Sequence, residues 1–563
     1  MNVLRTTSRW ASFACALLLA CDPRSTPSGQ TADSQTNWLR TCEIDNDCKA
    51  ADASALSLTC ICGVCSRTCQ TSATCGEAGV SCVQSDEAGS LAQCVGAQPA
   101  GLGLCLPECK EGGCDEGQLC AAGVCTPLTA PGPEVTVKME LAHQTLVGFG
   151  ASIAYSDAQI ADHPQRARLL DAVFKDLGLD VLRLRNRYVD SKDVSKTGEL
   201  IAASTASLGH PPILFLTSWT PPLALKANSL LACKGNAGCT LSKTPEGSFD
   251  YAGFAQYWRD SLDAYAEVGV KPDYIGIQNN PNWMPNEGDV FEACKFLPVE
   301  GSAIASIGGK DTAVDYPGLA EAQKAVVEAL ASLSPRPKLL APETSGSANI
   351  IDYVGALDLA NVDAYAHHLF GSDPTESDPG GLAAGLETLP SEAKRPVFVT
   401  EMEADGFGTA LSLHHATVDA DAAVFLQNAL TSPPTGPGIN AQALLSVDDT
   451  TFTAQDPYHA IRHFAHSTAP GWTRVSATTS LPDLLVSAWA SPSQDALTVI
   501  LINAGSSELR FQLGLPELSG TSSEITRSVF SGAERSASLG QFTADRVLQL
   551  PPRSVMTVAL EAP

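Results

Sequence analysis

From about residue 135 onward, short apolar runs alternate with longer segments in which apolar residues recur every three to four positions. Short apolar runs are typical of buried β-strands, and the longer spacing is typical of amphipathic helices. Eight strand candidates occur in this part of the chain: 145–152, 180–185, 211–219, 273–279, 337–343, 361–368, 395–401 and 441–447. Helices or long loops separate them, among them 166–178, 254–269, 319–333 and 419–432. This alternation predicts an α/β fold, a parallel (β/α)8 barrel of the TIM type.

The pattern changes again near Trp472, where short alternating runs are separated by Ser, Gly, Asp and Pro. Such runs are typical of a β-sandwich. We therefore expect a barrel over 134–465 and a C-terminal β-sandwich side domain over 466–563, completed by a strand at 134–143. The proline-rich stretch before residue 134 reads as a linker.

Ahead of the barrel, fourteen cysteines crowd into the segment 41–126, which has few large apolar residues. An even number of cysteines in an exported chain predicts disulfides, which such a segment needs in place of a core. Zinc is the alternative, because Cys62 and Cys65 have the spacing of a metal-ligand pair. No histidine occurs in this segment, so we favour a small disulfide-rich module.

The N-terminus is typical of an export signal, with Arg5 and Arg9 before a short apolar stretch. The stretch ends in Leu-Leu-Ala-Cys at Cys21 and resembles a bacterial lipoprotein box, which implies a signal peptide over 1–20 and a lipid on Cys21. A cleaved signal with an incidental cysteine is the alternative. Residues 21–40 are polar and rich in Ser and Thr, as in a flexible tether. We expect an exported protein that is anchored by lipid to a bacterial membrane or cell surface.

Composition and net charge limit the classes of partner that the protein is expected to bind. The 563 residues are 44% apolar and carry a net charge of −27, without a cluster of Lys and Arg. Nucleic acid is therefore not an expected partner.

In a (β/α)8 barrel the chemistry lies at the carboxyl ends of the strands. Most of the apolar runs here end in polar, aromatic or charged residues: Arg183, Arg185, Ser218, Trp219, Asn279, Asn280, Glu343, His367, His368 and Glu401. The convergence of several such ends predicts an active or binding site on that face.

Segments that carry these strand ends resemble glycoside hydrolase family 30, the group of glucosylceramidases, endo-xylanases and related β-glycanases. The likeness extends from about Val135 to Leu560, and its segments stand in the order of the family: 144–158, 218–226, 277–283, 366–371, 397–403, 458–475 and 550–560. It implies a retaining hydrolase that uses two carboxyl groups and needs neither a cofactor nor a metal.

The resemblance also implies roles for single residues. Glu401 would be the nucleophile, and Arg183 would keep it ionised. Asn279 would contact the sugar hydroxyl next to the reacting carbon. Trp219, Trp283 and His368 would line the sugar subsite.

The position of the acid/base residue is occupied by Asn280, and an amide cannot deliver a proton at neutral pH. Either the protein has given up the chemistry, or a nearby carboxylate replaces the missing acid. Two further departures point to loss: Phe370 stands where the family has tyrosine, and the expected eighth strand ends in "ALLSVDD" rather than at tryptophan. The possible replacements are Glu287, Asp289, Glu292 and Glu403, of which Glu292 has the look of a structural residue.

We therefore expect a β-glycan hydrolase of the retaining type, acting on a polysaccharide or oligosaccharide such as xylan. The alternative is an inactive, polysaccharide-binding surface lipoprotein, and a third reading is an adhesion protein. Recognition of a uronic acid on xylan would need a cation, and Arg185, Arg187 and Lys226 are available for it. A disulfide from Cys294 to Cys233 or Cys239 is expected near this site.

Overall fold

The protein is described by a computed structural model. The described residues are 38, 39, 42, 48 and 57–561, without 77, 85–87, 89–90, 92–94, 96–100, 110–113, 115–117, 122, 128–133, 190–191, 234–237, 286–290, 308–309, 348, 371–385, 387–388, 433–441, 482, 517, 519–521 and 544–545. The expected signal peptide, the lipid site at Cys21 and the tether lie outside the described residues.

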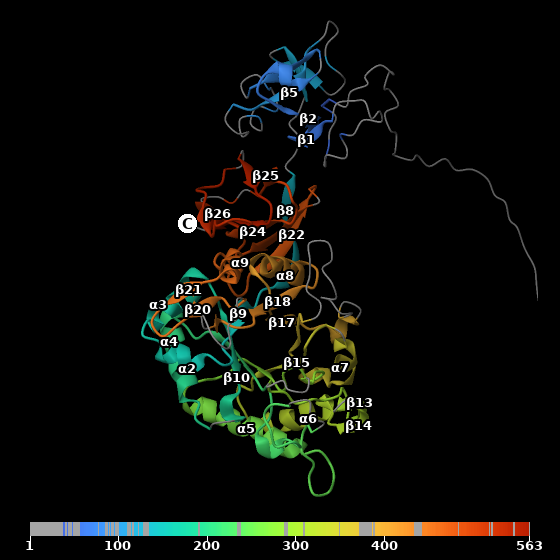
Figure 1. Ribbon diagram of the computed structural model, residues 1–563, viewed down its shortest axis with the longest axis vertical. Coiled ribbons are helices and arrows are strands. Elements are labelled where there is room, and N and C mark those ends of the chain that lie inside the picture. Colours follow the sequence, from blue (N-terminus) through green and yellow to red (C-terminus); the bar gives the residue numbers. More distant parts are fainter. Residues whose placement is uncertain are drawn as a thin grey trace, which may run out of the picture.

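Eight parallel strands close into a barrel in the lower half of Figure 1. Around the barrel they are β9 (Gly148–Ser152), β10 (Val181–Arg185), β11 (Ile213–Thr217), β12 (Tyr274–Gly276), β15 (Lys338–Thr344), β16 (Ala364–His368), β17 (Val397–Met402) and β18 (Ala422–Gln427). The expected (β/α)8 barrel is thus confirmed.

The eighth strand is not the one expected from the sequence. The segment 441–447 contributes β20 (Leu445–Val447) to a small sheet with β19 (Thr431–Ser432) and β21 (Phe452–Ala454). The barrel is closed by β18, which lies within the segment that was taken as a helix or loop. Every residue of β18 is buried, so the strand has no polar alternation, and a short continuous apolar run does not distinguish a strand from a buried helix. The comparison of "ALLSVDD" with the end of a barrel strand was therefore wrong.

Helices follow most strands and cover the barrel: α2 (Asp157–Asp162), α3 (Arg166–Asp171), α4 (Ser195–Leu208), α5 (Tyr251–Glu267), α6 (Leu319–Leu330), α7 (Ile350–Ala356), α8 (Gly406–Val418) and α9 (Asp456–Ala465). Helix α5 shows why these segments are helical. The Asp250 carboxylate caps its N-terminus by accepting from the Gly253 amide, 2.8 Å away. Phe254, Trp258 and Leu262 recur at intervals of four and are buried in the core.

The barrel interior is filled by side chains from alternate positions of its strands. Val181, Phe215, Tyr274, Leu340 and Phe398 belong to one buried cluster at the level of the strand middles. Because side chains on a strand alternate between faces, the residue two positions further along points inward as well. On β10 and β11 these next positions are Arg183 and Thr217, so the interior changes from apolar to polar toward the carboxyl ends.

Above the barrel in Figure 1 lies a nine-stranded sheet in the order β27-β26-β29-β24-β23-β22-β8-β25-β28. Its strands are β8 (Val135–Thr145), β22 (Thr473–Thr479), β23 (Leu484–Ala490), β24 (Leu497–Asn503), β25 (Leu509–Gly514), β26 (Ser522–Val529), β27 (Ala537–Ser538), β28 (Val547–Leu550) and β29 (Ser554–Glu561). The sheet has a hydrophobic cluster of its own. Strand β8 comes before the barrel in sequence but lies between β22 and β25, two strands that follow it.

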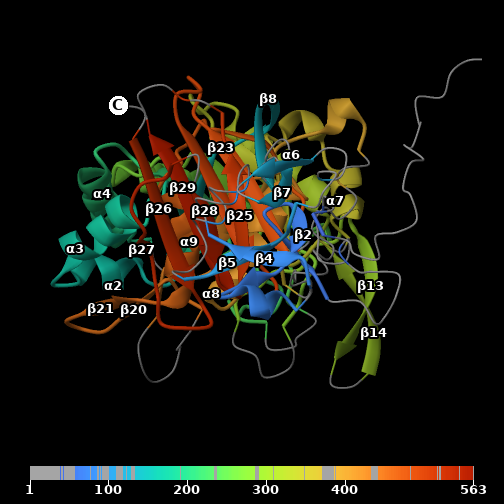
Figure 2. The same ribbon diagram turned by 90° about the horizontal axis from the view of Figure 1, so that it is seen from above.

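The cysteine-rich segment forms short hairpins beyond this sheet, blue in Figures 1 and 2. They are built from β1 (Thr59–Ile61), β2 (Val64–Ser66), β3 (Thr68–Cys69), β4 (Val80–Val83), β5 (Gly103–Pro107), β6 (Gln118–Ala121) and β7 (Val124–Pro127). Disulfides join Cys42 to Cys60, Cys48 to Cys65, Cys69 to Cys82, Cys75 to Cys105, Cys109 to Cys120 and Cys114 to Cys125. Cys62 is disulfide-bonded as well. The Cys62-x-x-Cys65 pair therefore offers no thiolates for zinc, and the disulfide interpretation is confirmed.

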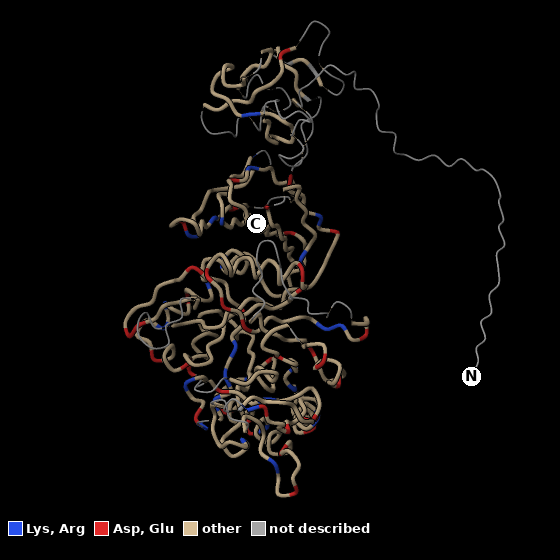
Figure 3. Tube along the Cα trace, turned by 45° about the vertical axis from the view of Figure 1, so that its right-hand side comes forward, with Lys and Arg blue, Asp and Glu red and all other residues tan. Residues whose placement is uncertain are grey.

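Two further features concern the distribution of charged and apolar residues along the chain. Lys and Arg are interspersed with Asp and Glu along the trace rather than gathered in one place (Figure 3). Within the described part of the chain, no helix combines the length and the apolar character that crossing a membrane requires.

Candidate active site

Arg183 occupies the centre of the polar end of the barrel. It lies on β10 and is fully buried. Its Nη1 donates to Glu401 Oε1, and its Nη2 donates to Asn279 Oδ1 at 2.6 Å and to Glu343 Oε1 at 3.0 Å. The guanidinium also lies over the Trp219 ring, 4.3 Å from the centroid. One side chain thus links the carboxyl ends of β10, β12, β15 and β17.

Glu401, near the end of β17, is buried to 4% exposure. Burial raises the pKa of its carboxyl, and the charge of Arg183 acts in the opposite direction. His368 on β16 lies beside it, with Nδ1 3.6 Å from Glu401 Oε2. Burial and the neighbouring Arg183 hold the pKa of His368 well below its usual value, so this ring is neutral at pH 7. The Glu401 carboxyl and the neutral imidazole of His368 therefore lie side by side.

The sequence placed Glu343 at a strand end but gave it no role, and the structure makes it the second carboxyl on Arg183. The β15–β16 register shifts between Pro342 and Thr344, and Glu343 has φ of 60°, in the left-handed region that a non-glycine residue rarely adopts. This irregularity turns its side chain into the barrel. Local sequence patterns carry no signal for such a bulge.

The Glu343 carboxyl has space because Gly276 on β12 has no side chain. A Cβ on Gly276 would lie 1.8 Å from Glu343 Oε2. The Thr217 hydroxyl stands against the same carboxyl, 3.2 Å from Oε1 and 3.4 Å from Oε2. Glu343 is 1% exposed, so it lies in the floor of the site.

The two asparagines of the fourth strand have different surroundings. The Asn279 side chain is held by Arg183, and its backbone amide donates to Ser218 O at 2.8 Å. Asn280 has φ of 48° and donates its backbone N–H to Glu343 O at 3.0 Å. Its Oδ1 is buried and has no hydrogen-bond partner within the described part of the chain.

Other buried polar atoms near these strand ends also have no hydrogen-bond partner among the residues that the structure describes: Gln278 Oε1, Thr400 Oγ1, and both ring nitrogens of His368. Buried polar atoms are normally paired, and unpaired ones call for an explanation. A ligand rich in hydroxyl groups would supply both donors and acceptors to such a set.

Aromatic rings gather on loops that follow the strands. Trp219 packs edge-on against Tyr155, with centroids 6.3 Å apart, and Trp283 packs against Phe291 at 6.1 Å. Tyr155, Phe291 and also Phe370 are exposed, at 64%, 59% and 37%. Exposed aromatic rings around a polar centre are suited to stacking on the apolar faces of sugar rings.

None of the carboxylates that the sequence offered as a replacement acid contacts Glu401 among the described residues. Glu292 accepts two hydrogen bonds from Arg185, at 2.8 Å and 2.5 Å, which is the structural role expected for it. Glu403 accepts from Asn428 at 3.0 Å. Glu287 and Asp289 lie outside the described residues.

The cations expected to recognise a uronic acid already have partners inside the protein. Arg185 pairs with Glu292, and Arg187 pairs with Asp157 at 2.6 Å. Lys226 is buried, and its Nζ donates to Ala293 O.

The expected cysteine pairing in this region was wrong. Cys233 bonds Cys239 with their Cα atoms 4.9 Å apart, and Cys294 is free and buried. The two cysteines of one short loop already stand within disulfide distance, so the bond closes that loop instead of linking it to the next.

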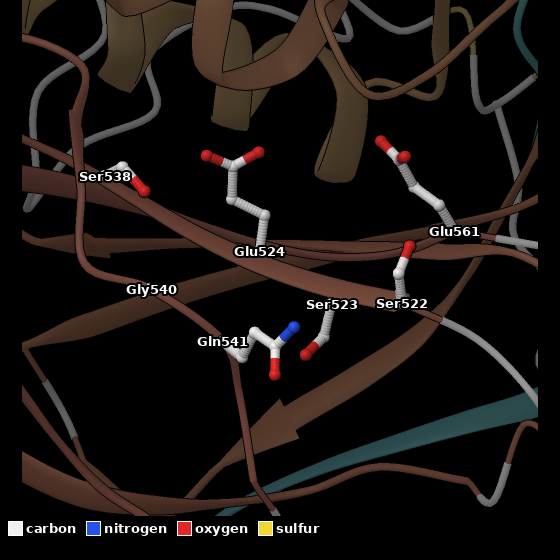
Figure 4. Close-up of a pocket in the computed structure, with 7 residues that line it drawn as sticks. All are labelled: Ser522, Ser523, Glu524, Ser538, Gly540, Gln541 and Glu561. Carbon is white, nitrogen blue, oxygen red and sulfur yellow. The ribbon is translucent and has the colours of Figure 1, made fainter.

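The side domain has a pocket that is separate from this centre (Figure 4). It is lined by residues of the nine-stranded sheet and its loops: Ser522, Ser523, Glu524, Ser538, Gly540, Gln541 and Glu561. None of them is a barrel residue.

Comparison with known proteins places the fold. The sequence matches no family model and no curated protein. The structure is similar to the catalytic domain of the family 30 xylanase C from Talaromyces cellulolyticus, with a TM-score of 0.59 and 17% identity over 76% of this chain and all of that one. A glycoside hydrolase family 30 subfamily 8 xylanase from Clostridium acetobutylicum gives 0.57 and 21% over the same shares. The endo-β1,6-glucanase BT3312 gives 0.56 and 14%, over 77% of this chain and 96% of that one. At such identities the likeness establishes that the fold is shared with these proteins.

Proposed function

We propose that the protein is a retaining glycoside hydrolase that acts on a β-glycan, with Glu401 as the nucleophile. The observation that carries the proposal is the Glu401 carboxylate, buried at a strand end, held by Arg183 and flanked by the neutral His368. Arg183 offsets the cost of burying the charge and orients one oxygen, which leaves Oε2 toward His368. Such a carboxylate can attack an anomeric carbon.

In the first step Glu401 forms an ester with the sugar, and the bond to the leaving oxygen breaks. In the second step water releases the sugar. Asn279, fixed by Arg183, contacts the hydroxyl next to the reacting carbon. His368 donates to or accepts from another sugar hydroxyl, and Trp219 and Trp283 hold neighbouring rings by stacking.

The position of the acid is held by Asn280, so the proton for the leaving oxygen is not supplied from there. General acid catalysis is worth about 10²–10⁴-fold, and natural glycans, whose leaving groups are poor, bear that loss in full. An aryl glycoside with an acidic phenol needs little protonation. Such a substrate therefore tests the nucleophile independently of the missing acid.

The test is mass spectrometry of the protein after incubation with dinitrophenyl β-glycosides of xylose and of glucose. A sugar adduct on Glu401 is expected, because the second step is slow without a base, and azide should speed its release. Glu401→Gln is the control that removes the adduct. Replacing Asn280 by Glu should raise activity on the polysaccharide by about 10²–10⁴-fold. If neither an adduct nor a gain in the Asn280→Glu variant is found, the protein is not a hydrolase.

A polysaccharide-binding protein is the second candidate function, and Asn280 favours it. Its expected result is affinity for a glycan, measured by calorimetry, without an adduct on Glu401.

Xylan is our best substrate, supported by the likeness to two xylanases. Because Arg185, Arg187 and Lys226 have internal partners, we place recognition on the neutral backbone sugars and not on a uronic acid.

We further propose that the protein is exported and attached to a membrane through a lipid on Cys21. The disulfide-rich module supports an oxidising location. Replacing Cys21 by Ser should move the full-length protein from the membrane to the soluble fraction of the cells. A variant that stays in the membrane fraction would contradict the anchor.

A further inference from the structure

The unusual feature of this centre is its charge. Two carboxyls, Glu343 and Glu401, contact one guanidinium, that of Arg183. Glu343 and Arg183 are 1% and 0% exposed, so water screens little of the repulsion between the two acids. If both carboxyls were ionised, the cluster would hold a net negative charge in a buried place, which is costly.

The groups around the cluster provide no second cation among the described residues. Thr217 on β11 and Asn279 on β12 are uncharged, and His368 on β16 is neutral because its pKa is lowered by burial and by Arg183. Tyr155, on the loop after β9, is a phenol and carries no charge at pH 7. A single proton shared between the two carboxyls therefore makes the cluster neutral.

The contacts decide which carboxyl carries that proton. Arg183 Nη1 lies closer to Glu401 Oε1 than Nη2 lies to Glu343 Oε1, where the distance is 3.0 Å. Nη2 is also shared with Asn279. Glu343 in addition accepts from the Thr217 hydroxyl, which the carbonyl oxygen of a carboxylic acid can do as well as a carboxylate. Burial raises the pKa of both carboxyls, and the charge of Glu401 raises that of Glu343 further.

We propose that Glu343 is the proton-holding partner of Glu401: it stays a neutral carboxylic acid while Glu401 is ionised on Arg183. This deepens the proposed function, on which its catalytic meaning rests. Glu343 acts through Arg183 and not on the sugar itself, so it is a positioning residue.

The arrangement balances the charges of the first step. When Glu401 becomes an ester, its negative charge is lost and Arg183 faces Glu343 alone. Glu343 then ionises and releases its proton to water, and the leaving oxygen takes a proton from water, so the protons balance. Hydrolysis of the ester reverses both changes: water loses a proton, Glu343 regains one, and Glu401 is again the anion. The centre stays neutral throughout, although Asn280 holds no proton.

Infrared difference spectroscopy of the full-length protein at pH 7 tests the proposal without any sugar. The spectrum of wild type minus Glu343→Gln should show the C=O band of a protonated carboxyl, displaced in D₂O. Glu401→Gln should also abolish this band, because Arg183 then has one acid left, which ionises. Glu292→Gln is the matched control: Glu292 is a partly buried glutamate paired with Arg185, and the band should remain.

A band that survives in Glu343→Gln, or one that persists in Glu401→Gln, overturns the proposal, as does its absence from the wild type. Circular dichroism checks that each variant is folded. Removing either acid leaves the other alone on Arg183, so Glu343→Asp and Glu401→Asp, which keep both acids, locate the proton: the band should change frequency in Glu343→Asp and stay in place in Glu401→Asp, and the reverse would overturn the proposal. A missing adduct on Glu401 together with the expected band would refute the hydrolase and leave this charge arrangement standing.

Discussion

At the scale of single residues, Arg183 has the largest influence on the site, because two carboxyls depend on its charge. Both are buried, and breaking a buried ion pair leaves an uncompensated charge, which costs about 3–5 kcal/mol. Arg185, which pairs with Glu292, offers a direct comparison on the same strand.

Replacing Arg183 by Gln should lower the free energy of unfolding at pH 7 by about 3–5 kcal/mol. Without the cation, the pKa values of Glu343 and Glu401 in the folded state rise further above their unfolded values. The folded protein then binds more protons than the unfolded one, so stability falls as pH rises above about 4.5 and recovers on acidification. Urea unfolding of Arg183→Gln and Arg185→Gln between pH 5 and 8 checks this. Equal pH slopes in the two variants would contradict it, because Glu292, the partner of Arg185, is only partly buried, whereas Glu343 and Glu401 are buried.

At the scale of elements, the end of β15 depends on its neighbour β12. The bulge after Pro342 directs Glu343 inward, and Gly276 leaves the space that its carboxyl fills. Packing requires a glycine at this position, because a Cβ on residue 276 would overlap an oxygen of the Glu343 carboxyl. The φ angle of Gly276 is not the reason.

Replacing Gly276 by Ala should therefore push the Glu343 carboxyl away from Arg183. We expect a loss of about 1–3 kcal/mol of stability, as for other overpacked cores, together with loss of the protonated-carboxyl band. Gly355 in α7 is the control, since a Cβ there meets nothing within 4 Å, and alanine in a helix should be neutral or stabilising. Thermal unfolding of both variants measures the difference. An unchanged Gly276→Ala protein would show that the carboxyl does not need this space.

At the scale of the whole molecule, β8 ties the side sheet to the start of the barrel chain. It pairs with β22 on one side and β25 on the other, and it places Val135 and Val137 in the core of the sheet. The cysteine-rich segment, in contrast, has its own disulfides and small clusters.

A chain that starts at residue 134 should therefore fold, whereas one that starts at residue 147 and lacks β8 should be clearly less stable. Removing the two buried valines alone forfeits about 3–6 kcal/mol, before the lost strand pairing is counted. Urea unfolding of both truncated chains is the measurement. Equal stability would mean that the side sheet does not depend on its central strand.

The sequence by itself determined the features that recur along the chain or depend only on neighbouring residues. Apolar runs and helical spacing predicted seven of the eight barrel strands, because each run is bounded by polar residues. The even set of cysteines predicted the disulfides. The sequence also placed Arg183, Asn279, His368 and Glu401 at strand ends, which a barrel brings together at one face.

Tertiary structure decided the rest. The eighth strand was missed because a fully buried run reads equally well as a helix, and only closure of the barrel selects β18. The pairing of Cys233 with Cys239 depended on loop geometry. Glu343 was visible as a letter at a strand end, but its meaning required a register shift in β15, the empty space at Gly276 and the second nitrogen of Arg183. Gly276 and Arg183 lie 67 and 160 positions before Glu343 in the chain, and only folding brings them within reach of its carboxyl.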